Sequence, residues 1–307
     1  MFSKEEAVDF AEKTLKIENP LVKFRENPLD LLNCLVRAFH NAIPSQSATL
    51  LAVDVEERRV PSVGDIRQAL LSGMGGLCIV NNSSLKFLVE ALGFNVKLVP
   101  STVTFHNHHC VVIVSNVLRD GDQFLLEAGC CYPTFEAIPL DFDAESPVYR
   151  HSFLQFRLVR KGELIERQHF KRSHDSIGED TRKWVRFYDF NPNSIAVDVS
   201  YFDPYMEVEY TGTSGSVFAF CLRVVSFKND KCTALKDNSL LVEGDDHHLH
   251  ETKLKSTDEM KHHLREMCPN IPSHVIAKAL AFWEKKIKPR LELDQGGLSA
   301  VDIEEIV

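Results

Sequence analysis

The amino-acid sequence predicts an α+β protein of about three structural units. Three observations lead to this class. In the first ninety or so residues the apolar side chains recur at the spacing of a helix, and between residues 95 and 190 they gather in runs of strand length. The remaining residues combine both patterns. With 307 residues, of which 44% are hydrophobic and 26% charged, the chain can bury a substantial core.

Four helices are predicted in the first part of the chain from the residues at their ends. A serine or asparagine that can accept a hydrogen bond from the first helical turn marks three of the starts, and a glycine marks two of the ends. The predicted starts are Ser3 with Glu6, Asn27 with Pro28, Ser62 with Asp65, and Cys78, and the last two helices end at Gly73 and Gly93.

From residue 95 onward, short runs of β-branched, leucine and aromatic residues predict strands. The runs are VKLV (96–99), HHCVVIVSNV (108–117), QFLLEA (123–128), FLQFRLVR (153–160), WVRFYDF (184–190), SVFAFCLRVVSF (216–227) and SLLVEG (239–244). Two later segments, at about 257–267 and 274–285, have the helical pattern instead.

Asp120 and Gly121 predict a hairpin turn between two of these strands. If the two residues form the whole loop, Glu127 falls opposite Val114. If the loop is wider, or one strand carries a bulge, Glu127 comes close to His109 instead. The sequence leaves both arrangements open.

Composition narrows the possible functions. The net charge of −9 argues against a general nucleic-acid binder, and there is no apolar run long enough to predict a membrane-spanning helix. The first residues, MFSKEEAVDF, carry acidic side chains where a signal peptide needs an apolar stretch, so we expect a cytoplasmic protein. Eight cysteines without a CxxC pair predict free thiols. The oligomeric state does not follow from the sequence.

Metal and nucleotide signatures are weak. The histidine-rich segment DDHHLHE (245–251), with His262 and His263 nearby, lacks the spacing of a tetrahedral site, so we expect no metal. Neither GxxxxGK[ST] nor GxGxxG occurs. The cluster of Arg182, Lys183 and Arg186 is better interpreted as a charged surface than as a phosphate site.

Cys78 is the candidate nucleophile. It follows Gly75 and Gly76 at a predicted helix start, where the positive end of the helix dipole favours a thiolate, although a small buried cysteine would fit there as well. His109 precedes an apolar strand and Glu127 follows a hairpin, so the chain offers a thiol, a base and a carboxylate to orient the base.

Two neighbouring histidines, His106 and His108, compete for the role of base. We expect both to be exposed loop residues, because only His109 directly precedes the apolar run CVVIV. Asn82 lies one helical turn after the candidate nucleophile and could either support the site or cap the local backbone.

The segment GGLCIVNN followed by ALGF, the histidine that opens an apolar strand, and the acidic-Ala-Gly step after a hairpin resemble the arylamine N-acetyltransferase family. The resemblance continues in LLNCLVRAFHNAIP and in TSGSVFAFCLRVVSFKNDKCTALKDNSLL, so it covers nearly the whole chain. Within the family motifs, the matching positions are Gly75, Gly76, Cys78, Asn82, Glu127 and Gly129.

This resemblance implies a helical bundle (1–93) bearing the nucleophile, an antiparallel β-barrel (94–190) bearing His109 and Glu127, and an α/β lid (191–307), around a core similar to cysteine proteases and transglutaminases. It also implies a ping-pong acetyl transfer. Cys78 would take the acetyl group from acetyl-CoA and pass it to an aromatic amine or hydrazine, with His109 as the base and Glu127 orienting it. No metal is implied.

Several positions depart from the family pattern. Glu127 replaces the usual aspartate, Met74 replaces an arginine, and Cys130-Cys131 replaces a Phe-Gly pair, which predicts the loss of an aromatic wall of the amine pocket. The family's P-F-E-N segment is Pro44-Ser45-Gln46-Ser47 in this chain. These changes leave two other functions open: a thiol-dependent hydrolase or other acyltransferase on the same framework, and a non-catalytic binding module.

Overall fold

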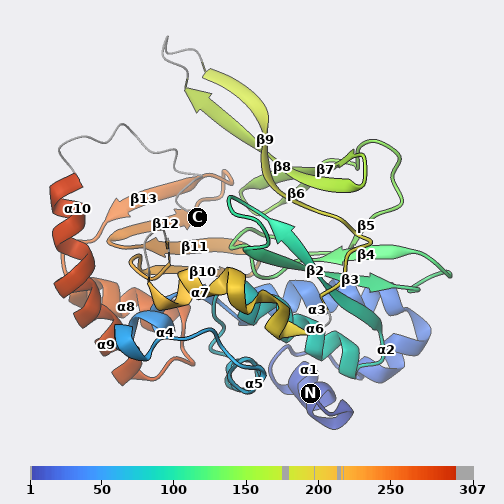
Figure 1. Cartoon of the computed structure of the whole chain (residues 1–307), viewed down its shortest axis with the longest axis horizontal. Helices are drawn as coiled ribbons and strands as arrows, with labels where there is room; N and C mark the ends of the chain where they lie inside the picture. Colours follow the sequence, from blue (N-terminus) through green and yellow to red (C-terminus); the bar gives the residue numbers. More distant parts are fainter. Residues whose placement is uncertain (1, 175–179, 197, 213–215, 217, 295–307) are drawn as a thin grey trace.

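The computed structural model describes residues 2–174, 180–196, 198–212, 216 and 218–294, and the side chains of 172–182 lie outside the description. Figure 1 shows helices from the N-terminal part of the chain beneath a curved antiparallel sheet, and a second sheet with helices beside it. The predicted α+β class is confirmed. In the described part of the chain, no helix is long and apolar enough to cross a membrane.

The N-terminal helices begin where the cap residues predict. Ser3 and Ser62 each form a reciprocal capping box, and the Asn27 side chain accepts a hydrogen bond from the Asp30 N–H. Gly73 ends one helix with φ of 67°, in the left-handed region that favours glycine. The helices are α1 (Lys4–Lys13), α2 (Pro20–Glu26), α3 (Pro28–Ala42), α4 (Ala48–Leu51), the 3-10 turn η1 (Val55–Glu57), α5 (Val63–Ser72) and α6 (Cys78–Ala91).

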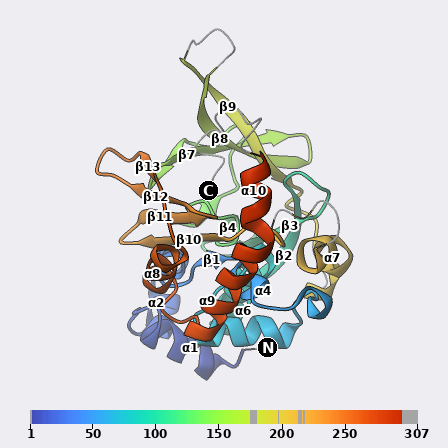
Figure 2. The same ribbon diagram turned by 90° about the vertical axis from the view of Figure 1, so that its left-hand side faces the viewer.

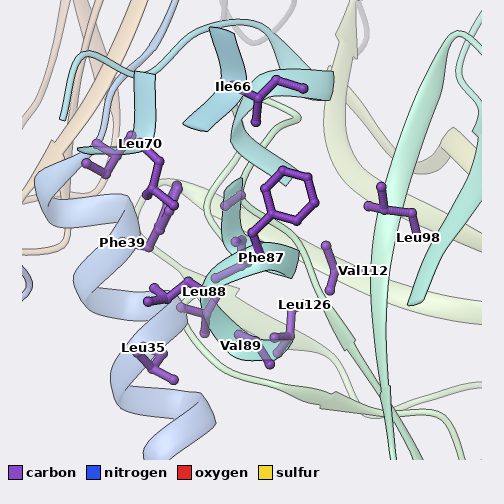
Figure 3. Packing of buried hydrophobic residues seen from close by; sticks show 14 of the residues in the cluster. Leu35, Phe39, Ile66, Leu70, Phe87, Leu88, Val89, Leu98, Val112 and Leu126 are labelled. Atoms are coloured by element: carbon purple, nitrogen blue, oxygen red, sulfur yellow. The ribbon is translucent and has the colours of Figure 1, made fainter. Parts of the chain in front are cut away.

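Helix α6 lies at the centre of this half of the molecule. It contacts α1, α3 and α5 as well as strands β2 (Asn95–Thr102) and β3 (His109–Ser115). Figure 3 shows the apolar side chains that fill the space between these elements. The labelled residues are Leu35, Phe39, Ile66, Leu70, Phe87, Leu88, Val89, Leu98, Val112 and Leu126. Because α6 is held on several sides, its first residue has a fixed position.

The larger sheet has the strand order β5-β4-β3-β2-β9-β8-β7-β6, with antiparallel pairing throughout. Its remaining strands are β4 (Gln123–Leu126), β5 (Ile138–Pro139), β6 (Tyr149–His151), β7 (Leu154–Lys161), β8 (Leu164–His174) and β9 (Asp180–Phe190). Figure 1 shows the β8–β9 ribbon extending beyond the body of the molecule. One face of β2, β3 and β4 packs on α6, which brings the start of β3 close to the start of the helix.

The smaller sheet has the order β1-β10-β11-β12-β13. Its members are β1 (Ser45–Gln46), β10 (Arg223–Lys228), β11 (Lys231–Lys236), β12 (Ser239–Glu243) and β13 (Leu249–Lys253). Because β1 comes from the helical part of the chain, the sheet joins that part to the C-terminal region. Hydrophobic packing crosses the segments as well: Phe202 and Met206 join the core around α6.

Helices accompany the smaller sheet. Figures 1 and 2 show α8, α9 and α10 on the same side of the molecule, next to β10–β13. The C-terminal helices are the 3-10 turn η2 (Val199–Phe202), α7 (Asp203–Thr211), α8 (Thr257–Met267), α9 (Ser273–Phe282), the π-helical turn η3 (Trp283–Ile287) and α10 (Lys288–Asp294). The bounds of α8 agree with the sequence prediction for that segment.

Candidate active site

The loop before α6 places Cys78 next to a neighbouring chain segment. Gly75 has φ of 66°, and a Cβ atom there would lie 1.9 Å from the carbonyl oxygen of Pro44, so only glycine fits. The Gly76 carbonyl accepts a hydrogen bond from the Gln46 N–H at 3.0 Å. The N-cap residue Leu77 has no side-chain acceptor for the first helical N–H groups. The positive end of a 14-residue helix therefore faces the thiol.

A wide loop sets the register between β3 and β4. Val112 pairs with Leu126 and Ser115 with Gln123, so residues 116–122 form the connection. The Asp120-Gly121 turn is present inside this loop, but it is not the whole loop. The Asp122 carboxylate accepts hydrogen bonds from the N–H groups of residues 117, 118 and 119, at 2.7, 2.8 and 3.0 Å. The wider loop shifts Glu127 away from Val114 and toward the start of β3.

His109 and Glu127 form a buried pair. The Nε2 atom of His109 lies 2.8 Å from Oε2 of Glu127, and the two residues are 2% and 0% exposed. Since Nε2 of His109 is bound to the carboxylate, Nδ1 is the ring nitrogen left for Cys78, whose thiol interacts with His109. The Cys78 Sγ atom also lies 3.8 Å from the carbonyl oxygen of His108. The structure thus brings together the three residues predicted from the sequence.

Asn82 holds the carboxylate of this pair. Its Nδ2 atom donates to Glu127 Oε1 at 2.8 Å and to the Cys110 carbonyl at 2.6 Å, while its Oδ1 accepts from the Ala128 N–H at 2.9 Å. The Gly129 N–H donates to the same Oε1 at 2.7 Å. Of the two roles considered for Asn82, the structure shows support of the site. With three donors on Glu127, the longer side chain in place of aspartate is fully hydrogen-bonded.

Gly129 is also the point where the hairpin touches the helix start. A Cβ atom at this position would lie 2.7 Å from the Cys78 carbonyl oxygen and 2.7 Å from Asn82 Nδ2. Any larger residue would push the strand end away from Cys78. Close packing against the start of α6 therefore explains why the acidic-Ala-Gly step ends in glycine.

The electrostatics of the pair favour its ionised form. Burial alone would lower the pKa of His109, but the Glu127 charge and the hydrogen bonds to Cys78 and Glu127 outweigh it and raise the pKa to about 10. Burial alone would raise the pKa of Glu127, whereas the charge and hydrogen bond of His109, together with the Asn82 and Gly129 donors, lower it. At neutral pH the two residues form a buried imidazolium–carboxylate pair.

Cys78 and His109 open into a cleft of about 630 Å³. Its other lining residues are Val103, Thr104, Phe105, His108, Gly129, Cys130, Cys131, Tyr132, His169, Lys171, Val185, Arg186, Phe187, Glu209, Phe218 and Arg223. Cys130 and Cys131 line the cleft at the positions of the family's Phe-Gly pair, so the loss of that particular aromatic wall stays a prediction. Four aromatic side chains, Phe105, Tyr132, Phe187 and Phe218, line the cleft besides them. No local motif marks these residues, since they come from separate loops and strands.

The competing histidines differ from each other. His106 is exposed, as predicted. The prediction of an exposed loop residue is wrong for His108: its side chain is 17% exposed, lines the cleft and lies 3.6 Å from the Glu209 carboxylate. Helix α7, which carries Glu209, covers this loop from a distant part of the chain.

Arg167 and His169 were not predicted as parts of the site. Both lie on β8 and are fully buried. The Arg167 Nε donates to His169 Nε2 at 3.1 Å, Nη1 donates to Thr134 Oγ1 at 2.7 Å, and Nη2 donates to the Pro133 carbonyl at 3.2 Å. The arginine thus holds the segment after Glu127. In β8 every second side chain points inward, and Arg167 and His169 share this alternation with the buried Ile165. The pattern was visible in the sequence, but charged residues are normally exposed, so it did not predict burial of Arg167.

The basic cluster considered for phosphate binding is split. Lys183 is exposed, and the side chain of Arg182 lies outside the described residues. Arg186 lines the cleft, but its guanidinium is bound to Asp189 and to the carbonyls of Thr102 and Val103. All eight cysteines are free thiols. Among the described residues, no group of three or more His, Cys, Asp or Glu side chains could hold a metal ion.

Comparison with known proteins supports the fold. Among solved structures, the chain is similar to the arylamine N-acetyltransferase of Mycobacterium marinum, with a TM-score of 0.72 and 17% identity over 91% of this chain and 99% of that one. The enzyme from Salmonella typhimurium gives a TM-score of 0.70 at 16% identity, covering 92% and 99%. The M. marinum enzyme in complex with CoA gives 0.69 at 16% identity, covering 90% and 99%. At these identities the likeness shows the fold.

A comparison with curated protein sequences finds no significant match. The family model described as N-acetyltransferase matches residues 29–269, which is well over half of the sequence. The chain therefore belongs to the arylamine N-acetyltransferase family.

Proposed function

We propose that the protein transfers an acetyl group from acetyl-CoA to an aromatic amine or hydrazine, in two steps, through an acetyl-Cys78 intermediate. The observation that carries the proposal is the buried His109–Glu127 pair, 2.8 Å apart, with the Cys78 thiol interacting with the same imidazole and lining the same cleft. Family membership and the CoA complex of a similar structure support the choice of acyl donor.

In the first step, Cys78 attacks the thioester carbonyl as a thiolate paired with the His109 imidazolium. The bond between the carbonyl carbon and the sulfur of CoA breaks, and His109 gives its proton to the leaving thiolate. Glu127 keeps the imidazole in one orientation and stabilises its positive charge. Because thioesters are reactive, most of the rate comes from positioning and from the supply of thiolate.

In the second step, the amine nitrogen attacks the carbonyl of acetyl-Cys78. The bond to Sγ breaks, and the now neutral His109 takes the proton from the amine. The aromatic lining of the cleft from Phe105, Tyr132, Phe187 and Phe218 suits a flat aromatic acceptor. No metal takes part in the proposal.

Intact-protein mass spectrometry tests this function. Incubation with acetyl-CoA is expected to add one acetyl group, which peptide mapping places on Cys78, and addition of an arylamine such as 4-methylaniline is expected to remove it. Cys78→Ala should abolish the adduct, whereas Cys34→Ala, at a half-buried cysteine on α3 away from the cleft, should leave it unchanged. A folded protein that takes no acetyl group on Cys78 would exclude the proposal. Loss of the group to water as fast as to the amine would favour a hydrolase.

A further inference from the structure

Arg223 is hydrogen-bonded through its backbone to the chain segment that contacts the loop before Cys78. It is the first residue of β10, where its N–H donates to Ser47 Oγ at 2.9 Å and its carbonyl accepts from the Ser47 N–H at 2.9 Å. The neighbouring Gln46 donates to the Gly76 carbonyl, two residues before Cys78. Arg223 and Cys78 therefore lie on adjoining, hydrogen-bonded segments.

The guanidinium of Arg223 has no polar partner among the residues that the structure describes. Its Nε atom is buried without a hydrogen bond, and its contact is the face of the Phe218 ring, 5.4 Å from the ring centroid. Arg186, in the same cleft, is by contrast fully engaged. Glu209, the carboxylate among the cleft-lining residues, faces His108 and Ser216. An unpaired, partly buried guanidinium is costly unless a ligand supplies an acceptor.

The position of Arg223 brings its side chain close to the nucleophile, because Arg223 and Cys78 line the same cavities. Besides the large cleft, Arg223 lines a small hollow of about 10 Å³ together with Cys78, Gly129, Cys131 and Phe218. Burial raises the pKa of Cys131 to about 11, and the charge of Arg223 opposes this rise, as expected for close neighbours. A hollow of this volume holds about one water molecule, which is less than a carboxylate needs, so a ligand group would approach Arg223 from the large cleft, which Cys78 also lines. The phosphates of CoA are separated from its sulfur by the pantetheine arm, so they do not lie beside the nucleophile during acyl transfer. The guanidinium of Arg223, by contrast, lies near Cys78. A short group attached to the Cys78 sulfur can reach it.

Resting on the proposed acyl transfer, we infer that Arg223 is a specificity-determining residue that binds a carboxylate at the end of a short acyl chain, so that the protein accepts dicarboxylic acyl thioesters such as malonyl-CoA and succinyl-CoA. A guanidinium is planar and presents two parallel N–H donors, which match a carboxylate. The acyl step itself is unchanged. The thioester bond breaks, the bond to Cys78 Sγ forms, CoA leaves with the proton from His109, and the terminal carboxylate stays ionised against Arg223.

Acylation of Cys78 in a single turnover tests the inference, with quenched samples read by intact-protein mass spectrometry. The donors are malonyl-CoA and succinyl-CoA, and propionyl-CoA and butyryl-CoA as uncharged counterparts. For the wild type, we expect malonyl-CoA to acylate Cys78 at least about tenfold faster than propionyl-CoA at equal, subsaturating concentration, because a charge-assisted pair contributes at least that factor. Arg223→Met should remove this preference and leave the propionyl rate within about twofold. Arg223→Lys should retain part of it.

Arg119→Met is the matched control, because Arg119 is exposed and pairs with Asp141 in the β3–β4 loop. It should leave both rates unchanged. Should Arg223→Met fail to fold, the wild-type ratio still decides the question. Normal acylation by acetyl-CoA and propionyl-CoA with none by the dicarboxylic donors would overturn the inference and leave the proposed function standing. If no donor acylates Cys78, both the inference and the proposed function are wrong.

Two further outcomes would contradict the assignment to the acyl group. An equal slowing of all donors in Arg223→Met would mean a general electrostatic effect. An unchanged donor ratio, with slower transfer to 4-aminobenzoate relative to aniline, would assign the carboxylate to the acceptor amine.

Discussion

Replacing Glu127 by glutamine removes one negative charge from the buried pair and keeps the shape of the side chain. The pKa of His109 is about 10, compared with an ordinary value of 6.5, because the ionised partners outweigh its burial. At 1.36 kcal/mol for each pKa unit, this difference corresponds to a preference for the imidazolium on the order of 5 kcal/mol. Glu127→Gln removes much of that preference, because the introduced amide carries no charge. We therefore expect acylation of Cys78 to slow by roughly 10³- to 10⁴-fold.

The assay is the acylation rate of Cys78 by acetyl-CoA as a function of pH. The wild type should keep its rate at mildly alkaline pH, because His109 stays protonated until about pH 10. The residual activity of Glu127→Gln should be lost at a lower pH than that of the wild type, already near neutral pH. Glu136→Gln is the matched control, since Glu136 also binds a histidine, His151, at 3.1 Å, but lies outside the cleft lining. A rate for Glu127→Gln within tenfold of wild type would refute the role given to the pair.

Two more predictions concern packing and pH. Gly129→Ala should lower the acylation rate at least about tenfold, because its Cβ would lie 2.7 Å from the Cys78 carbonyl oxygen and displace the helix start. Gly64→Ala, whose Cβ has room 3.6 Å from the nearest atom, is the control, and equal rates for the two variants would contradict the packing argument. The free energy of unfolding, measured by denaturant titration, should depend on the His109–Glu127 pair. The raised pKa of His109 contributes stability that is complete below about 6.5 and lost as the pH rises through about 10. The lowered pKa of Glu127 contributes stability that is present above its ordinary value of 4.5 and lost in acid. The difference in unfolding free energy between the wild type and Glu127→Gln should therefore be largest between about pH 4.5 and pH 6.5.

The parts of the fold that the sequence predicts well depend on local signals. Ser3, Asn27 and Ser62 accept hydrogen bonds from N–H groups only three residues away, so the cap residues are enough to place α1, α3 and α5. Helix α2 was not predicted, although Asn19 and Pro20 repeat the start signal of Asn27 and Pro28, because it is only seven residues long and shows little helical periodicity of its own. Strand β8 was missed because its inward face carries Arg167 and His169 in place of apolar residues.

The candidate site was predicted residue by residue, but its geometry was not. The sequence suggested Cys78, His109 and Glu127, yet it could not decide how far apart the last two lie, because the register depends on how Asp122 organises the hairpin loop. The neighbours of Arg223 were even less accessible to sequence reasoning. They are Phe218 and Ser47, and Ser47 directly follows β1, which is only two residues long and has no hydrophobic pattern of its own.

That short strand β1 also bears on how the protein folds. The contact between Arg223 and Ser47, the residue directly after β1, joins residues 176 positions apart, and it helps to fix the segment against which the Cys78 loop rests. Contacts of such long sequence separation form slowly, because the entropy of closing the intervening chain is lost before they stabilise anything. Cys78, His109 and Glu127 all lie before residue 130, so a nascent chain carries the whole candidate triad long before β10 exists. On the ribosome, therefore, the reactive groups are synthesised early, but the residues that line the cleft are complete only once Arg223 has been made.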